Sequence, residues 1–428
     1  MLRKRVLVVA IIGVVIAGLG WGSALSFGSN NHARGNSSKT PALSGKLTLM
    51  WTSSQLAVMQ KVVNGFERKY PKVQIALSGV NALDLTTALT PLIQAGNPPD
   101  LAYAAPGRVS PYAVESVASK LVSLTGPWTK QLPSVFQSPE IGYDSKARDY
   151  LAAPLGIAPE GVIYNQSIFA SLKLHIPTTF SQLLGLCAKI NAAGKTPLGF
   201  AEPVLTPFVY LDEAAPLFVF GKDPNWIAQR VARKVSFSTS AGWRKVITNW
   251  QAMIKAKCFS PGASGQGLTQ DIAGMAHGTT VMDIQESPSL GSIEAVAPGI
   301  RLGMFDLPGD STSQRGAVIG LVNNIMAFKT HRAALQQAFI NFLMTPKELQ
   351  VYNAGIGTLS PSQWSKRQLP AAWAPIAADA KYRTTLSPGD QMPSENWLLG
   401  STNPLIELMT GQLTSVSQVL AALDKAQP

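Results

Sequence analysis

Apolar and polar residues near the start of the chain body alternate first at strand spacing and then at helix spacing. Residues 46–51 (KLTLMW) follow the two-residue period of a half-buried strand, and the apolar residues of 56–66 repeat at helical spacing. Pro71 ends that helix, and a second strand is predicted over 73–77. A helix over 83–94 and a strand over 100–104 follow. Strand–helix–strand units of this length predict a parallel sheet in an α/β fold.

The ends of these strands carry the first candidate binding residues. Ligands of open parallel sheets bind beyond the carboxyl ends of the strands. Trp51, Thr52 and Ser53 end the first strand, 78–79 end the second, and Tyr103 ends the third. We therefore expect these positions to lie on one edge of the sheet.

The N-terminus predicts the compartment. Arg3, Lys4 and Arg5 precede an apolar run over 6–22, which is the pattern of an export signal. The run is also near the lower length limit of a membrane-spanning helix, so 1–26 is interpreted as a cleaved signal peptide or an uncleaved anchor. No cysteine follows the run, which excludes a lipobox lipoprotein. Residues 27–44 read as a flexible polar linker, and the remaining chain is predicted to be extracytoplasmic.

Composition removes several function classes. Charged residues make up 14% and hydrophobic residues 46% of the 428 residues, which argues against a disordered chain. The chain has 36 basic and 24 acidic residues, but five basic and no acidic residues lie within 1–40. The remaining basic residues form no stripe with interleaved aromatics, so we expect no nucleic-acid partner. Four isolated histidines and two cysteines suggest neither a metal site nor a cofactor.

The two cysteines, Cys187 and Cys258, leave two possibilities open. In an oxidising compartment a pair of cysteines favours a disulfide. Two buried free thiols are the alternative, and the bond requires Cα atoms within about 7 Å of each other.

An ordered set of motifs resembles a known family. The segments GFERKYPKVQI (65–75) and LTPLIQAGNPPDLAYA (89–104) are similar to the extracellular solute-binding proteins of sugar-type ABC importers. The resemblance continues through 150–154, 162–184, 278–287, 302–310, 334–361 and 409–426, and so covers nearly the whole body. It implies a two-lobed, periplasmic-binding-protein-like (type II) α/β fold, with hinge crossings and a ligand cleft. The implied divisions are lobe I at 45–157 and 317–358, and lobe II at 158–316 and 359–428.

The resemblance also implies a binding site. A sugar needs aromatic rings for its C–H faces and planar polar groups for its hydroxyls. The ligand-binding candidates are Trp51, Thr52, Ser53, Tyr103, Tyr164, Glu202, Gln285, Glu286, Asn323 and Trp397. Each aromatic candidate could instead be a core residue, and Glu286 could be a solvated charge. The chain has Glu286-Ser287-Pro288 where many members have Gly-x-Trp, which shifts the expected stacking platform to Trp397.

The implied function is non-enzymatic, with no catalytic residues. We expect a carbohydrate of oligosaccharide size to be captured outside the cytoplasm by hinge closure and delivered to the permease subunits of an ABC importer. The protein is expected to be a monomer, and its N-terminal segment could tether it to the membrane. Two alternatives stay open. One is a secreted glycoside-acting enzyme, although no catalytic signature surrounds Glu202, Asp283 or Glu286. The other is a ligand-sensing partner of a membrane receptor.

Overall fold

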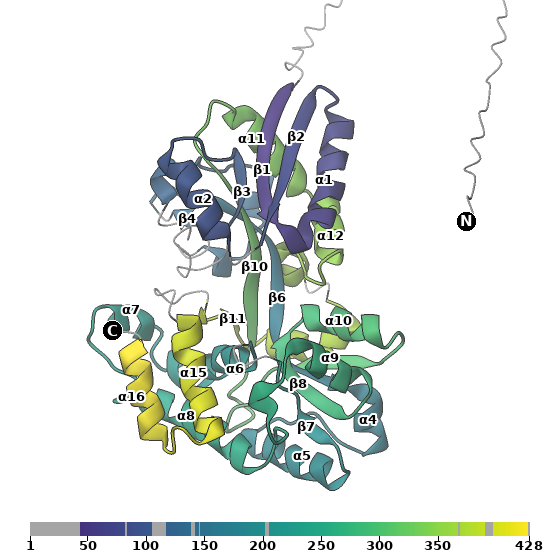
Figure 1. The fold of residues 1–428 in the computed structure, drawn as a ribbon, viewed down its shortest axis with the longest axis vertical. Coiled ribbons are helices and arrows are strands. Elements are labelled where there is room, and N and C mark those ends of the chain that lie inside the picture. The colour runs from purple at the N-terminus through teal and green to yellow at the C-terminus, as the bar shows by residue number, and fades with distance from the viewer. Residues whose placement is uncertain are drawn as a thin grey trace, which may run out of the picture. The chain divides into compact units, whose positions relative to one another are not determined.

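A computed structural model describes the body of the chain (Figure 1). The described residues are 43–81, 84–104, 117–137, 142–144, 146–201, 205–366, 369–389 and 397–426. The expected signal peptide or anchor (1–26), nearly all of the linker (27–44) and the candidate Glu202 lie outside them. Within the described residues, no helix has both the length and the apolar character needed to cross a membrane.

Eleven described strands form one nine-stranded mixed sheet and one two-stranded sheet. The main path runs β2-β1-β3-β10-β6-β8-β7, with β11 beside β10 and β9 beside β6; β4 and β5 form the small sheet. The strands are β1 (Gly45–Thr52), β2 (Val73–Val80), β3 (Leu101–Ala104), β4 (Tyr143–Asp144), β5 (Asp149–Tyr150), β6 (Ala152–Asn165), β7 (Thr196–Leu198), β8 (Thr280–Glu286), β9 (Leu302–Phe305), β10 (Ala317–Ala327) and β11 (Thr384–Leu386).

The helices cover both ends of this sheet (Figure 1). Those in the first half of the chain are α1 (Leu56–Lys69), α2 (Leu85–Gln94), α4 (Gln166–Ser171), α5 (Phe180–Ala192), α6 (Leu205–Ala215) and α7 (Trp226–Val231). Those in the second half are α8 (Ala241–Lys255), α9 (Leu268–Ala276), α10 (Pro288–Val296), α11 (Ala333–Leu343), α12 (Pro346–Ala354), α13 (Pro361–Ser365), α14 (Ala374–Asp379), α15 (Trp397–Thr410) and α16 (Val416–Ala426). A π-helix, η7 (Pro216–Phe220), directly extends α6.

The strands and helices expected over 46–104 are confirmed as β1, α1, β2, α2 and β3. Strand β1 pairs in parallel with both β2 and β3. The register places Trp51 opposite Gly79, and Met50 opposite both Ser78 and Ala102. The three strand ends therefore lie side by side on one edge, as expected. Strand β10 breaks the parallel pattern because it pairs antiparallel to β3 and to β6.

Strands β6 and β10 are long and antiparallel, and each contributes to more than one hydrophobic core. Ala153 and Leu155 of β6 pack in a first core with Leu47, whereas Val162 and Tyr164 of the same strand pack in a second core. Figure 1 shows the two strands running side by side from the β1–β3 end to the β7–β8 end. No other described strand is as long as either of them.

The first core fills the space between β1–β3, α1 and α11. Phe66 is fully buried and packs edge-on to Phe339, with ring centroids 5.2 Å apart. Asp100 anchors this end of the sheet, because Thr48, Thr330 and Arg332 all donate hydrogen bonds to its carboxylate. These donors come from β1 and from the segment after β10, so Asp100 links parts of the chain that are distant in sequence.

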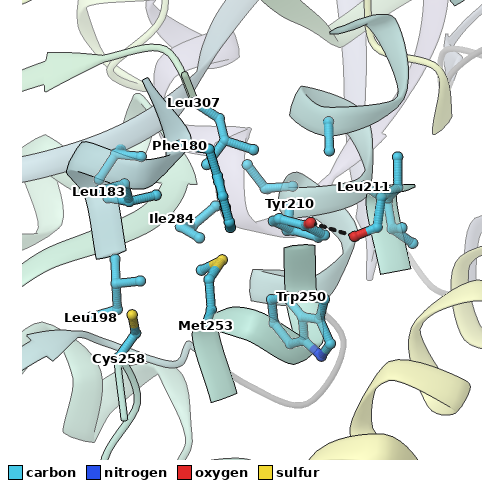
Figure 2. Close-up of a cluster of buried hydrophobic side chains, with 14 of the residues drawn as sticks. Phe180, Leu183, Leu198, Tyr210, Leu211, Trp250, Met253, Cys258, Ile284 and Leu307 are labelled. Carbon is cyan, nitrogen blue, oxygen red and sulfur yellow. Dashed lines mark hydrogen bonds between the residues drawn. The ribbon is translucent and has the colours of Figure 1, made fainter. Parts of the chain in front are cut away.

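The second core surrounds α6 and α8 (Figure 2). Trp243 and Trp250 are both fully buried on α8, as their seven-residue spacing predicts. The Tyr210 hydroxyl donates to the carbonyl of Val246 at 2.7 Å, which satisfies a buried polar group. Cys187 and Cys258 form a disulfide in this core, with Cα atoms 5.0 Å apart, and so connect α5 to the segment after α8.

A third core lies beside the second. It joins Ile157 and Ile163 of β6 to Ile319 of β10, Trp364 of α13 and Ile376 of α14. The segment after α12 also touches β6 here, since the peptide groups of Ile157 and Leu359 exchange two hydrogen bonds of 2.8 and 3.0 Å. Three segments of the chain therefore run side by side here: β6, β10 and the segment near Leu359.

Candidate functional site

The carboxyl end of β1 brings two aromatic candidates together. The Trp51 and Tyr103 rings meet edge-on with centroids 5.2 Å apart, and Trp51 also packs against Tyr352. Trp51 is fully buried, and its indole N–H has no acceptor within the described residues. The Tyr352 hydroxyl donates to Gln55 Oε1 at 2.7 Å. Burial, followed by the neighbouring Tyr103, raises the Tyr352 pKa, which keeps this phenol neutral.

Thr52 and Ser53 continue directly from Trp51 into the short helix before α1. Thr52 is buried, and its hydroxyl shares a 3.1 Å hydrogen bond with that of Ser54. Ser53 is exposed. The two residues therefore belong to the same strand edge as Tyr103 but differ in their access to solvent.

The middle of β10 carries two buried amide side chains at an interruption of the β-ladder. The pairing with β6 shifts register between Leu321 and Asn323 and again between Asn323 and Asn324. Both asparagine side chains are fully buried, and their amide atoms have no hydrogen-bond partner within the described residues. Tyr103 reaches this place because its hydroxyl donates to the carbonyl of Val322 at 3.1 Å. The structure thus brings Trp51, Tyr103 and Asn323 together.

The end of β8 forms a second group of candidates farther along β6. Gln285 and Glu286 pair with Gly161 and Glu160, and the peptide N–H of Ser287 donates to the carbonyl of Pro159. Gln285 is fully buried and accepts from the Ser289 hydroxyl at 3.2 Å. Glu286 is half-buried, and this burial raises its pKa. Glu160 and Glu286 are register partners, so their side chains share one face of the sheet.

Tyr164 lies apart from both groups. Its ring packs against Phe169 and Phe305 in the second core, at centroid distances of 4.6 and 5.6 Å. Burial raises the pKa of its hydroxyl. Among the remaining candidates, Trp397 is the first residue of α15, while Glu202 falls outside the described residues.

Sequence reasoning missed two buried polar residues near these groups: Glu160 and Ser287. Glu160 is the single charge in the long apolar run of 152–163, and that contrast was an available signal. Ser287 was named only as part of the segment that departs from a family motif. Asn324 directly follows the candidate Asn323, and no sequence pattern ranks one above the other.

Two surface hollows lie away from these groups. One of about 610 Å³ is lined by Lys257, Phe259 and Met409 near the disulfide, and one of about 600 Å³ by Thr48, Ser78 and Arg332. Neither contains a ligand candidate. Across the described ranges, no three His, Cys, Asp or Glu side chains come together as a metal site. The candidate residues therefore offer hydrogen-bonding amides, carboxyls and aromatic rings.

Sequence comparisons relate this chain to one known protein family. The sequence model of the bacterial extracellular solute-binding protein family matches residues 51–350. The multiple sugar-binding protein of Streptococcus mutans is 22% identical over 314 residues, which are 69% of this chain and 70% of that protein.

Solved structures show the same architecture at lower identity. The apo form of RafE from Streptococcus pneumoniae has a TM-score of 0.74 at 19% identity, covering 91% of this chain and 99% of that one. A binding protein of Bacillus subtilis in an open conformation has a TM-score of 0.73 at 17% identity, covering 90% and 98%. RafE in complex with raffinose gives 0.70 at 18% identity, covering 89% and 98%. These similarities confirm the expected α/β solute-binding-protein fold.

Proposed function

Because this chain belongs to the family of bacterial extracellular solute-binding proteins, we propose that it captures a carbohydrate of oligosaccharide size outside the cytoplasm. In this proposal it delivers the sugar to the permease subunits of an ABC importer. The related Streptococcus mutans protein is a multiple sugar-binding protein, and related solved structures contain raffinose and stachyose. Those ligands support the carbohydrate class, and the family supports the permease partner.

The observation that carries the proposal is the pair of long strands β6 and β10. Each passes from the first core to the second or third core, and a third segment near Leu359 runs beside them. A few residues in such crossings can absorb the φ/ψ change of a hinge. The register shifts around Asn323 interrupt the ladder between Leu321 of the third core and Ile325 of the first core, which supports a hinge there. A ligand that contacts both lobes then favours the closed state.

The lobe boundaries in this proposal follow the crossings. Lobe I comprises 45–157 and 317–358, and lobe II comprises 158–316 and 359–428. The first core is built from lobe I segments, and the second core from lobe II segments, which supports this division. Residues 1–26 would direct export or anchor the protein to the outer face of the cell membrane, and 27–44 would be the linker.

The proposed ligand contacts come from both lobes. Tyr103 and Asn323 lie at the lobe I end of the hinge strands, and Gln285 and Glu286 at the lobe II end. Trp397 would supply the stacking ring. Both amide atoms of Asn323 and the amide nitrogen of Gln285 are buried without a partner among the described residues. This supports a role in ligand binding, in which a sugar hydroxyl or a hinge motion provides the missing hydrogen bonds.

A screen of mono- and oligosaccharides by thermal shift, with X-ray scattering on any hit, tests this function. We expect an oligosaccharide at 100 times its Kd to stabilise the protein by about 2.7 kcal/mol and to reduce its radius of gyration. Stabilisation by a different solute class alone would contradict the carbohydrate proposal. Release of sugar from the same oligosaccharides would support the glycoside-acting alternative, and co-purification with a receptor instead of a permease would support the sensor alternative.

Glu286→Gln tests the ligand site in lobe II. Loss of a charge-assisted hydrogen bond to a sugar hydroxyl should weaken binding about 10- to 100-fold, since such bonds contribute about 1.5–3 kcal/mol. Calorimetric titration with the best sugar from the screen measures the change. Glu294→Gln is the matched control, because Glu294 is exposed on neighbouring α10. Equal affinity for wild type and Glu286→Gln would remove Glu286 from the site.

A further inference from the structure

Two buried aspartates face each other on the side of β8 that packs toward the third core, because Asp283 is the register partner of Ile163. Asp271 lies on α9 and Asp283 on β8, and their exposed fractions are 3% and 1%. Both carboxyls converge on Gly199. A Cβ at that glycine would collide with Asp271 Oδ1 and would lie 3.3 Å from Asp283 Oδ1. The close approach of two acids to one glycine needs an explanation, because burying a carboxylate without compensation is costly.

Positive charge does not provide that compensation. Neither carboxyl has an ion-pair partner among the described residues. The elements packed around the pair are α6, α9, α10, β6, β7 and β8. None of them contains a lysine, arginine or histidine. The ionisable groups that they do contain are Glu160, Tyr164, Tyr210, Asp212, Glu213, Glu286 and Glu294, in addition to the pair itself.

Hydrogen bonds from the described protein compensate the charges only in part. Both oxygens of Asp271 and Oδ1 of Asp283 have no donor in the described part of the chain. The peptide group of Ile284 and the side chain of Gln285 lower the pKa of Asp283, but burial outweighs them. Two ionised carboxylates can only accept, so no hydrogen bond forms between them. One proton between the two groups converts the repulsion into an O–H···O⁻ bond, which is among the stronger hydrogen bonds in proteins.

We propose that Asp271 and Asp283 share one proton and thereby make the fold more stable in an acidic medium than at neutral pH. Asp283 carries the proton and donates it to the Asp271 carboxylate. Burial, followed by the charge of Asp271, raises the pKa of Asp283 well above its usual range. Burial also raises the pKa of Asp271. The inference concerns the stability of the free protein and does not depend on which ligand it binds.

The direction of the pH effect follows from linkage. An aspartate in the unfolded chain titrates near pH 3.9, so the native state binds more protons above that pH. The contribution of the pair is therefore complete below about pH 4 and is lost as the pH rises through the folded pKa of Asp283. Each excess proton in the native state changes the unfolding equilibrium constant about tenfold per pH unit in this window.

Urea unfolding of the full chain between pH 4 and 7.5, followed by tryptophan fluorescence, tests the pair. Asp283→Asn keeps an N–H donor toward Asp271 but cannot release a proton. We expect the unfolding constant of wild type to rise with pH more steeply than that of this variant. The difference between the two should be about tenfold per pH unit. The exposed control Glu294→Gln should follow the wild-type curve. Equal slopes for Asp283→Asn and wild type would overturn the proposal.

A second variant and a spectroscopic measurement cover the case in which Asp283→Asn does not fold. Asp271→Asn should flatten the same curve, since its amide replaces the charge that the shared proton balances. In wild-type protein with ¹³C-labelled aspartate carboxyls, at least one aspartate should keep the chemical shift of the protonated acid at pH 6. If every folded aspartate has the ionised shift at pH 6, the proposal is wrong.

Discussion

Asp100 at the end of the first core and the Asp271–Asp283 pair beside the third core are both almost fully buried, yet they are stabilised in opposite ways. Asp100 accepts hydrogen bonds from the Thr48 peptide N–H at 2.8 Å, from the Thr330 hydroxyl at 2.7 Å and from Arg332 at 3.0 Å. In the pair, both oxygens of Asp271 and Oδ1 of Asp283 have no donor among the described residues. Burial alone therefore does not decide whether an aspartate is charged.

The number of hydrogen-bond donors decides whether a buried aspartate is charged, and the directions of the pKa shifts show this. Burial raises the pKa of Asp100, but the Thr48 peptide group, Thr330 and Arg332 outweigh it, so the net pKa is lowered. For Asp283 burial and the neighbouring charge act in the same direction, and the pKa is raised. The stabilisation by Asp100 is thus present above about pH 4 and is lost as the pH falls through its folded value. The stabilisation by the pair is instead lost as the pH rises through the folded pKa of Asp283.

The largest expected effect comes from breaking the compensated site. Asp100→Ala leaves the buried donors of Thr48 and Thr330 without an acceptor and Arg332 without its counter-ion. We expect a loss of about 3–5 kcal/mol in the free energy of unfolding at pH 7, because several hydrogen bonds to a buried charge are lost and each contributes about 1.5–3 kcal/mol. Urea unfolding measures it. A loss below about 1 kcal/mol would mean that the network contributes no more than a surface ion pair.

The partners of Asp100 could not be predicted from the local sequence, because Thr48, Thr330 and Arg332 lie 52, 230 and 232 positions away. Strands β1–β3 and helices α1 and α2 could be predicted, since their periodicity is complete within about 15 residues. The antiparallel insertion of β10 beside β3 brings together residues more than 200 positions apart, and the family resemblance indicated only that 317–358 return to lobe I.

The candidate site shows the same limit. The two groups of candidates that the structure forms, Tyr103 with Asn323 and Gln285 with Glu286, were each found as single positions at strand ends. Their burial was not predictable, because it depends on packing between distant segments. Asp283 was considered only as an unsupported catalytic acid. Its partner Asp271 had no signal, since one acid in an amphipathic helix resembles any solvated charge.

A medium effect is expected where the pair has its tightest neighbour. Gly199→Ala should cost about 1–3 kcal/mol, because the new methyl group must displace the Asp271 carboxyl in a well-packed interior. Thermal unfolding at pH 5 measures the loss. Gly185→Ala is the matched control, since Gly185 is exposed on α5 with open space around its Cβ position. Alanine there should stabilise the helix by about 0.5–1 kcal/mol. Equal effects at both glycines would show that the pair is not closely packed.

The smallest effect is expected at Glu213, which is intermediate between the two kinds of site. It accepts a 2.7 Å hydrogen bond from the Leu307 peptide N–H, as Asp100 does from Thr48, but it lies beside Asp306 and Asp379, as Asp283 does beside Asp271. Burial outweighs the Leu307 hydrogen bond and raises the Glu213 pKa to about 8.

Glu213→Gln resembles the protonated acid that this pKa implies at pH 6, and its amide oxygen can still accept from Leu307. We therefore expect a change below about 1 kcal/mol at pH 6. Above that pH the glutamine variant should become the more stable protein, because wild type loses the stabilisation of neutral Glu213 between about pH 4 and 8 whereas glutamine has no proton to lose. Urea unfolding of both proteins at pH 6 and pH 8.5 measures the crossover. A variant that is less stable by the same amount at both pH values would place Glu213 with Asp100, as a carboxylate whose donors keep it charged.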